Sequence, residues 1–436
     1  MKIYTYPSTS AEKKIASIVN RGIGVKKKDL FAVTRMIEDV RKNKDQALIE
    51  YTHRFDSPEL SIGSIQVAPE EFDDALKHVD RPFIRSLNRA VRQIESFHRQ
   101  QVFTSWINTE RPGTLLGQII NPVNAAGIYV PGGMGGKTPL VSSVIMGAVP
   151  AKVAGVKHIV MTTPPMKNGT INPHLLVAAK RVGINAVYKV GSAWAIAALA
   201  YGTETIPKVD VIVGPGNIYV AIAKKIVSGT VGIDMIAGPS EILIIADRTA
   251  NPEFIAADLL SQAEHDVLAS SILVTDSADI AKTVAAAVKE QLQNLSRKKI
   301  AEKALSRFGA IMIVADLDTA IELANQIAPE HLELQIKDPF SVMGQIRNAG
   351  AVFLGDYTPE PIGDYIAGPN HVLPTAGTAR FSSALSVDAF IKKTSLIRYS
   401  RAAFGREAKD VIRLAEIEGL DAHMNAVKIR FSQTRK

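Results

Sequence analysis

The chain has 436 residues, of which 46% are hydrophobic and 22% are charged, and its formal net charge is +8. This composition is typical of a folded globular protein rather than a disordered one, and the length favours two or more domains. No segment reaches the ~18 uncharged apolar residues that a membrane span requires, and Met1–Pro7 lacks the apolar core of a signal peptide. We therefore expect a cytoplasmic protein without a membrane partner.

The sequence contains no cysteine. Disulfides, thiolate–metal sites and cysteine nucleophiles are thereby excluded, and a transition metal would need histidine, carboxylate, amide or water ligands. The 51 basic residues outnumber the 43 acidic ones, but they are scattered and not interleaved with aromatic side chains. This distribution indicates a solvated surface and argues against a nucleic-acid partner.

Helical periodicity dominates roughly the first 110 residues. Residues 27–42 repeat apolar side chains along one helical face, and Pro82 begins another helix that runs towards Phe97. From about residue 125, short apolar runs alternate with helical segments. Strands are predicted at 127–130, 159–163, 186–190, 209–213 and 241–246, then at 272–275, 310–314, 332–336 and 351–354, and helices at 140–154, 172–182, 193–201, 218–227, 401–418 and 422–431.

Strands separated by helices predict parallel sheets that are covered on both faces. The predicted fold is therefore α/β, with two doubly wound, incomplete Rossmann-like lobes, an N-terminal helical segment and a small helical C-terminal tail. We assign 1–125 and 242–385 to a discontinuous main α/β domain, 126–241 to a second α/β domain, and 386–436 to the tail. Because the tail has few large apolar residues, we expect it to pack on another domain or on a second subunit.

A glycine-rich loop follows the strand predicted at 127–130 and ends in Gly-Gly-Lys-Thr. A P-loop needs glycine six residues before its lysine, and Pro131 occupies that position. The loop also lacks the G-x-G-x-x-G pattern of dinucleotide-binding folds. A ligand-binding loop and a tight structural turn both remain possible.

Several polar residues stand at the predicted ends of strands and helices. Asn217 and Ser240 follow glycine–proline turns, where they could bind a ligand or simply cap a turn or helix. Gln262 and His265 are three residues apart near a helix end and could share a metal or have surface roles. Glu330 precedes His331 at the start of a strand, where a turn could present both as an acid/base pair.

Four histidines lie in or beside motifs rich in glycine, proline or acidic residues: His265, His331, His371 and His423. Asp364 and His371 share a segment whose glycine and proline content predicts an irregular loop, and rigidly placed loops are where catalytic groups concentrate. Together with Asp364, these histidines suffice for one zinc site and for acid/base groups.

Seven segments stand in one order along the chain: GIYVPGG, VGPGN, IDMIAGPSE, DLLSQAEH, PEHLEL, GDYIAGPNHVLPT and DAHMNAV. In these segments the chain, from about residue 30 to its C-terminus, resembles the histidinol dehydrogenases. The resemblance implies a zinc-dependent, four-electron oxidation of L-histidinol to L-histidine through histidinaldehyde, with two NAD, in the last steps of histidine biosynthesis. It also implies a homodimer whose tail reaches into the partner's active site, so that Glu418 and His423 act in trans.

The resemblance further implies a role for each matching residue. His331 would be the general base for the alcohol proton, and Glu330 would activate water for the second oxidation. The implied zinc ligands are Gln262, His265, Asp364 and His423. The implied substrate contacts are Ser240, Gln262, His265, His331, Asp364, Glu418 and His423, and the implied NAD contacts are Tyr129, Asn217 and the position of Trp194. Because the chain has no cysteine, the second hydride should leave from a hydrated aldehyde rather than a thiohemiacetal.

Two features depart from the family's usual pattern. Trp194 stands where the family usually has a glutamine that contacts NAD, so an indole would stack on the cofactor or the contact would be lost. The loop Gly133–Val141 is a few residues longer than the usual form. Rival interpretations are a paralogous zinc/NAD dehydrogenase of another amino or sulfonated alcohol, a nucleotide-binding or phosphotransfer protein, and a non-catalytic metal-binding module.

Overall fold

The computed structural model describes residues 1–21, 24–132 and 138–434. The chain forms two compact units, one made of Met1–Gln101 and Val123–Phe390, the other of Val102–Pro122 and Ile391–Lys436. The first unit contains two parallel sheets, here called sheet A and sheet B. Among the described residues, no helix combines the length and apolar character needed to cross a membrane.

Sheet B is the doubly wound sheet predicted for the middle of the chain. Its strands are β4 (Ala125–Tyr129), β6 (His158–Thr162), β7 (Ala186–Tyr188), β8 (Val211–Val213) and β9 (Gly232–Ile233). They are parallel and lie in the order β7-β6-β4-β8-β9. Because the winding reverses between β4 and β8, the carboxyl ends of these two strands form a switch point, where α/β sheets bind ligands.

Helices cover both faces of sheet B. They are α2 (Lys27–Phe55), α3 (Pro69–Lys77), α4 (Arg81–Arg99), α6 (Val141–Ala154), α7 (Pro173–Val182), α8 (Ser192–Tyr201) and α9 (Ile218–Val227). One core packs Ile128 of β4 among residues of α4, α6 and α7, and the other packs Tyr129 among residues of α2, α8 and α9. The short β5 (Thr138–Pro139) precedes α6.

The N-terminal helices form as predicted, with two differences. The predicted face of α2 is buried at Val33, Ile37 and Val40, but α2 continues past residue 42 to Phe55, with a non-helical backbone at Lys44. Helices α2, α3 and α4 pack on α8, α7 and α6 of the sheet B lobe, whereas the sequence grouped them with residues 242–385. Periodicity shows that a helix has an apolar face but does not specify which sheet covers it.

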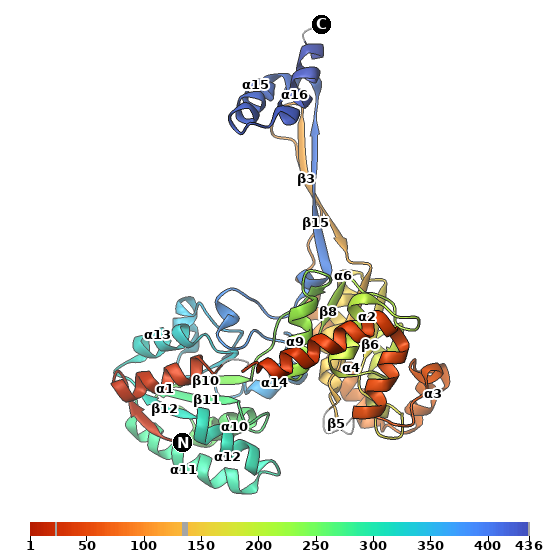
Figure 1. Ribbon diagram of the computed structural model, residues 1–436. Helices are drawn as coiled ribbons and strands as arrows, with labels where there is room; N and C mark the ends of the chain where they lie inside the picture. The colour runs from red at the N-terminus through yellow and green to blue at the C-terminus, as the bar shows by residue number, and fades with distance from the viewer. Residues whose placement is uncertain (22–23, 133–137, 435–436) are drawn as a thin grey trace. The chain divides into compact units, whose positions relative to one another are not determined.

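Sheet A is the second doubly wound sheet (Figure 1). Its strands are β1 (Ile3–Thr5), β10 (Glu241–Ala246), β11 (Ser270–Thr275), β12 (Ala310–Ile313), β13 (His331–Gln335) and β14 (Ala351–Leu354), in the parallel order β1-β12-β11-β10-β13-β14. Helices α10 (Pro252–Ala263), α11 (Ala278–Gln291) and α12 (Lys298–Phe308) cover one face, and α1 (Thr9–Val19) and α13 (Leu317–Ile327) cover the other. The three-residue edge strand β1 was not predicted.

The second unit is built on an antiparallel ribbon. Its elements are β2 (Trp106–Asn108), β3 (Thr114–Pro122), β15 (Ile391–Tyr399), α15 (Arg401–Ile417) and α16 (Asp421–Thr434). Strand β15 pairs with β3 along its whole length (Figure 1). The two tail helices are confirmed, but β3 and β15 were missed, because most side chains of β15 are exposed and do not alternate between apolar and polar.

We expect Phe390→Ala to destabilise the first unit by about 3–5 kcal/mol, because removing a fully buried phenylalanine leaves a cavity. Phe390 is 0% exposed, belongs to the core that sheet B forms with α4, α6 and α7, and its carbonyl accepts the N–H of Val123. Denaturant unfolding would measure the loss. Phe381, which is 81% exposed, provides the matched control, and an equal loss in Phe381→Ala would contradict the cavity explanation.

A second prediction concerns acid stability. His98 is fully buried in α4, its Nδ1 contacts Gln101 Oε1 at 2.7 Å, and burial lowers its pKa below the usual 6.5. As pH falls below 6.5, this histidine is therefore protonated in the unfolded chain before it is protonated in the folded protein. The free energy of unfolding decreases over this pH range. We expect His98→Gln to lose less stability between pH 7 and pH 5 than the unsubstituted protein. Thermal midpoints at both pH values test this, with the exposed His158 replaced by glutamine as the control, which should follow the unsubstituted protein.

Candidate active site

The predicted acid/base pair lies where β10 and β13 begin. Glu330 precedes β13, and its Oε2 accepts the backbone N–H of Glu241 at 2.9 Å. Glu241 Oε2 accepts the N–H of Glu330 in return at 3.2 Å. His331 Nδ1 lies 3.7 Å from Glu330 Oε2. Glu330 and His331 therefore lie close together, as the turn conformation considered from the sequence requires.

The tautomer of His331 follows from its hydrogen bond. Its Nδ1 lies 2.9 Å from the carbonyl oxygen of Glu241, so Nδ1 must carry the proton and donate it. Nε2 is then left with a lone pair, and it is buried without a hydrogen-bond partner in the described chain. Burial lowers the pKa of His331, so the ring is neutral at pH 7. His331 thus presents a proton acceptor to the site.

Arg21 supports this pair and was missed in the sequence. Its Nη2 lies 2.8 Å from Glu241 Oε1, and both side chains are nearly inaccessible to solvent. The same guanidinium donates to the carbonyl of Ser240, which places the predicted substrate contact Ser240 at the amino end of β10. A single arginine after a helix carries no periodic signal, so nothing near it in the sequence distinguishes it.

A group of possible metal ligands faces Nε2 of His331. Glu360 Oε1 and Asp364 Oδ1 each lie 4.0 Å from Nε2, and the ligand atoms of these three residues lie within 4.8 Å of one another. Both carboxylates come from α14 (Glu360–Tyr365). The sequence placed Asp364 in an irregular loop, but Pro361 is suited to the first turn of a helix, and Gly363 fits there because a Cβ would lie 2.7 Å from the Phe353 ring.

Glu360 was not predicted as a site residue. It is 1% exposed, and its Oε2 accepts the hydroxyl of Ser261 at 2.9 Å. The available signal was its spacing of four residues from Asp364, which places both carboxylates on one helical face. The interpretation of this segment as a loop concealed that signal.

Gln262 lies in the last turn of α10, and His265 follows just beyond the end of the helix. Gln262 is 0% exposed, and both atoms of its amide lack partners in the described chain. His265 follows the helix, donates its N–H to the Gln262 carbonyl at 3.2 Å, and is near enough to lower the pKa of both His331 and His371. An unpartnered buried amide costs stability, and a metal ion would relieve this cost, so the donor set fits a metal.

The electrostatics of the site also favour a cation. Burial, together with the charge of Glu360, raises the pKa of Asp364 to about 8. Burial and the neighbouring carboxylates raise the pKa of Glu330 well above its usual range. Burial and His331 lower the pKa of His371 to about 4. A bound cation reverses such shifts by stabilising the charged carboxylates.

A row of hydrogen-bonded, buried polar side chains on β13 holds the backbone of Glu360 in place. Gln335 Nε2 donates to Asp258 Oδ2 and to Glu333 Oε2, each at 2.9 Å. Glu333 Oε1 in turn accepts the N–H of Glu360 at 3.0 Å. His331, Glu333 and Gln335 alternate along β13 and so share one face of the strand. This row fixes the start of α14 and thereby the position of its two carboxylates.

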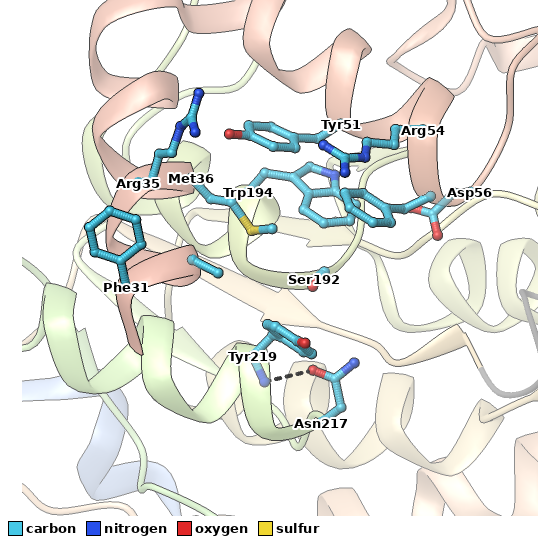
Figure 2. Close-up of a pocket in the computed structure, with 12 residues that line it drawn as sticks. Phe31, Arg35, Met36, Tyr51, Arg54, Asp56, Ser192, Trp194, Asn217 and Tyr219 are labelled. Carbon is cyan, nitrogen blue, oxygen red and sulfur yellow. Dashed lines mark hydrogen bonds between the residues drawn. The ribbon is translucent and has the colours of Figure 1, made fainter. Parts of the chain in front are cut away.

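The predicted cofactor contacts lie at the switch point of sheet B. Tyr129 ends β4, and its Oη accepts the N–H of Ser192 at 3.1 Å. Asn217 caps α9, accepting the N–H groups of Tyr219 and Val220. Ser192, Trp194 and Asn217 line a cavity of about 610 Å³ (Figure 2). The capping role considered for Asn217 is therefore observed, and the residue also lines the cavity.

Trp194 is 3% exposed, and its ring stacks with those of Tyr51 and Phe55 at centroid distances of 5.7 and 5.6 Å. Much of the indole is therefore covered by α2 and contributes to the wall of the cavity. Of the longer loop Gly133–Val141, residues 133–137 lie outside the described residues. Glu418 and His423 lie in the second unit, at the end of α15 and in the first turn of α16, and both are exposed.

Comparisons with known proteins identify the family of the chain. The family model of histidinol dehydrogenase matches residues 23–431. The chain is 54% identical to histidinol dehydrogenase of Desulfotalea psychrophila over 92% of each chain, and 54% identical to that of Clostridium acetobutylicum over 97% of each. It resembles the crystal structure of histidinol dehydrogenase from Elizabethkingia anophelis with a TM-score of 0.93 and 39% identity, covering 100% of this chain and 99% of the other. The chain therefore belongs to the histidinol dehydrogenase family of oxidoreductases.

Proposed function

We propose that this protein catalyses the zinc-dependent oxidation of L-histidinol to L-histidine through histidinaldehyde, with two NAD as hydride acceptors, in the cytoplasm. The observation that carries the proposal is the buried Nε2 of His331, which is unprotonated and faces the carboxylates of Glu360 and Asp364. A neutral imidazole in this position suits removal of an alcohol proton. Family membership supplies the substrate.

In the first oxidation, His331 accepts the hydroxyl proton of histidinol at Nε2 while hydride leaves to NAD. The hydrogen bond from Nδ1 to the Glu241 carbonyl keeps the lone pair on Nε2 and stabilises the imidazolium that forms. Such positioned general bases contribute about 10²–10⁴-fold to a rate.

In the second oxidation, Glu330 activates the water that hydrates the aldehyde. The chain has no cysteine for a thiohemiacetal, so the second hydride leaves from the hydrate. The raised pKa of Glu330 makes its carboxylate a stronger base than an exposed glutamate, which supports this role.

Gln262, His265 and Asp364, with His423 of the partner subunit, would hold the zinc ion. When bound, the ion orients the amine and imidazole nitrogens of the substrate and offsets the negative charge of Asp364 and Glu360. Ser240, and Glu418 of the partner subunit, are further proposed substrate contacts. The proposal therefore includes a homodimer with exchanged tails.

On the cofactor side, Tyr129, Trp194 and Asn217 are the proposed NAD contacts. Support comes from their place at the carboxyl ends of β4, β7 and β8, beside the switch point of sheet B. There Asn217 and Trp194 line the cavity, and Tyr129 fixes Ser192 on its wall.

We expect the purified protein to form two NADH per L-histidinol, to lose this activity on chelation, and to regain it with zinc. The metal dependence follows from the unpartnered Gln262 amide and the clustered carboxylates. Absorbance at the NADH band, together with metal analysis, measures both. A folded, zinc-loaded protein that forms no NADH with histidinol would contradict the proposal and direct the search to other amino alcohols.

We also expect Glu330→Gln to slow aldehyde oxidation about 10²–10⁴-fold and alcohol oxidation much less. Glutamine retains an oxygen that can accept the Glu241 N–H but cannot take a proton from water. Single-turnover rates with histidinol and with histidinaldehyde separate the two steps. Glu322→Gln, which removes an exposed carboxylate of α13, is the control, and equal slowing of both steps in Glu330→Gln would refute the assigned role.

A further inference from the structure

The cavity beside Trp194 contains several side chains to which no role has yet been given. Tyr51 and Trp194 supply aromatic surface, Arg35 and Arg54 supply guanidinium groups, and Asp56 supplies a carboxylate (Figure 2). Phe55 adds a further ring to the lining. Aromatic rings suit a nucleobase, guanidinium groups suit phosphates, and a carboxylate suits a pair of ribose hydroxyls. The lining therefore matches the parts of an adenosine nucleotide.

Asp56 is the residue of this lining that most needs a ligand. It ends α2, where its backbone N–H donates to the Thr52 carbonyl. Its Oδ2 is inaccessible to solvent and has no hydrogen-bond partner in the described chain. Burial raises the pKa of this carboxyl to about 6. A carboxylate oxygen that is inaccessible to solvent and has no donor is costly, and a donor from a bound molecule would offset the cost.

The position of Asp56 also fits a dinucleotide. Its charge raises the pKa of Tyr129, so the two side chains are near each other, and Tyr129 ends β4 at the switch point. In dinucleotide-binding folds an acidic side chain hydrogen-bonds the ribose 2′-hydroxyl of NAD, and a carboxylate in that place would repel the additional 2′-phosphate of NADP. Asp56 comes from a different part of the chain, but its carboxylate could make the same contact.

We propose that Asp56 binds the ribose hydroxyls in the adenosine half of NAD and thereby selects NAD over NADP. This inference rests on the proposed function only in taking NAD as the cofactor. Arg35 and Arg54, which are exposed at the cavity, would attract phosphate groups of either cofactor, so discrimination depends on the carboxylate. Removing that negative charge should therefore weaken NAD binding and improve NADP binding.

The test uses Asp56→Asn and Asp56→Ser in the full-length protein. The chain has two tryptophans, Trp106 in β2 and Trp194 in the cavity, so Trp106→Phe leaves Trp194 as the single fluorophore. Titration of its fluorescence with NAD and NADP gives both affinities without turnover. We expect each Asp56 variant to bind NAD about 10- to 100-fold more weakly and NADP more tightly, with KM for NAD rising and KM for histidinol unchanged.

Glu59→Gln is the matched control, because Glu59 is an exposed carboxylate close in sequence that does not line the cavity. Since Oδ2 of Asp56 has no hydrogen bond to lose within the described residues, Asp56→Asn should keep the thermal midpoint. Unchanged NAD and NADP affinities in both variants, or a parallel fall in both, would overturn the proposal. If the unsubstituted protein binds NAD but does not oxidise histidinol, the proposed function fails while the role of Asp56 still stands or falls on the titration.

Discussion

Glu241 and Glu330 each accept the backbone N–H of the other, and these two hydrogen bonds join the amino ends of β10 and β13. The rest of the active site depends on this contact. The carbonyl of Glu241 sets the tautomer of His331, and the carboxylate of Glu241 is balanced by Arg21. Two buried carboxylates so close together would otherwise repel each other. One guanidinium and two amide donors make the arrangement stable, and they leave Glu330 free to gain a proton.

The two sheets have the same winding order, but their candidate site residues lie at opposite ends of the strands. The proposed NAD contacts lie at the carboxyl ends of sheet B, whereas Glu330 and His331 lie at the amino end of sheet A. The segment 234–240 connects the carboxyl end of β9 directly to the amino end of β10. Its start is fixed by Asp234, which accepts the Gly214 N–H at 2.7 Å and pairs with the buried Lys224. This short connection joins the strand ends of sheet B that would bind the cofactor to the strand ends of sheet A that carry His331.

The sequence was most informative where burial imposes a pattern. Most strands of the two sheets are largely apolar runs, because helices cover both faces, and the strands that were predicted agree with the structure to within a few residues. The short strands β1 and β9 were not predicted. The ribbon of β3 and β15 was missed because most of its side chains are exposed and carry no such pattern. Arg21, Glu333 and Gln335 were missed for another reason. Their roles depend on partners distant in sequence, such as Glu241 and Asp258, which only the folded chain brings together.

Glu360 could serve as a metal ligand or as a negative charge beside His331. His331, Glu360 and Asp364 could together hold a metal, yet His331 has one lone pair, on Nε2, and cannot both bind an ion and accept a proton. Gln262 and His265 offer neutral donors from α10, and the Gln262 amide lacks another partner. If these two residues and Asp364 bind the ion, His331 keeps its lone pair for the substrate. Glu360, held by Ser261 and by the Glu333 contact to its backbone, would then add negative charge beside the imidazolium that the proposed reaction forms. The charge that makes the site costly without a cation thus favours both the metal and the protonated base.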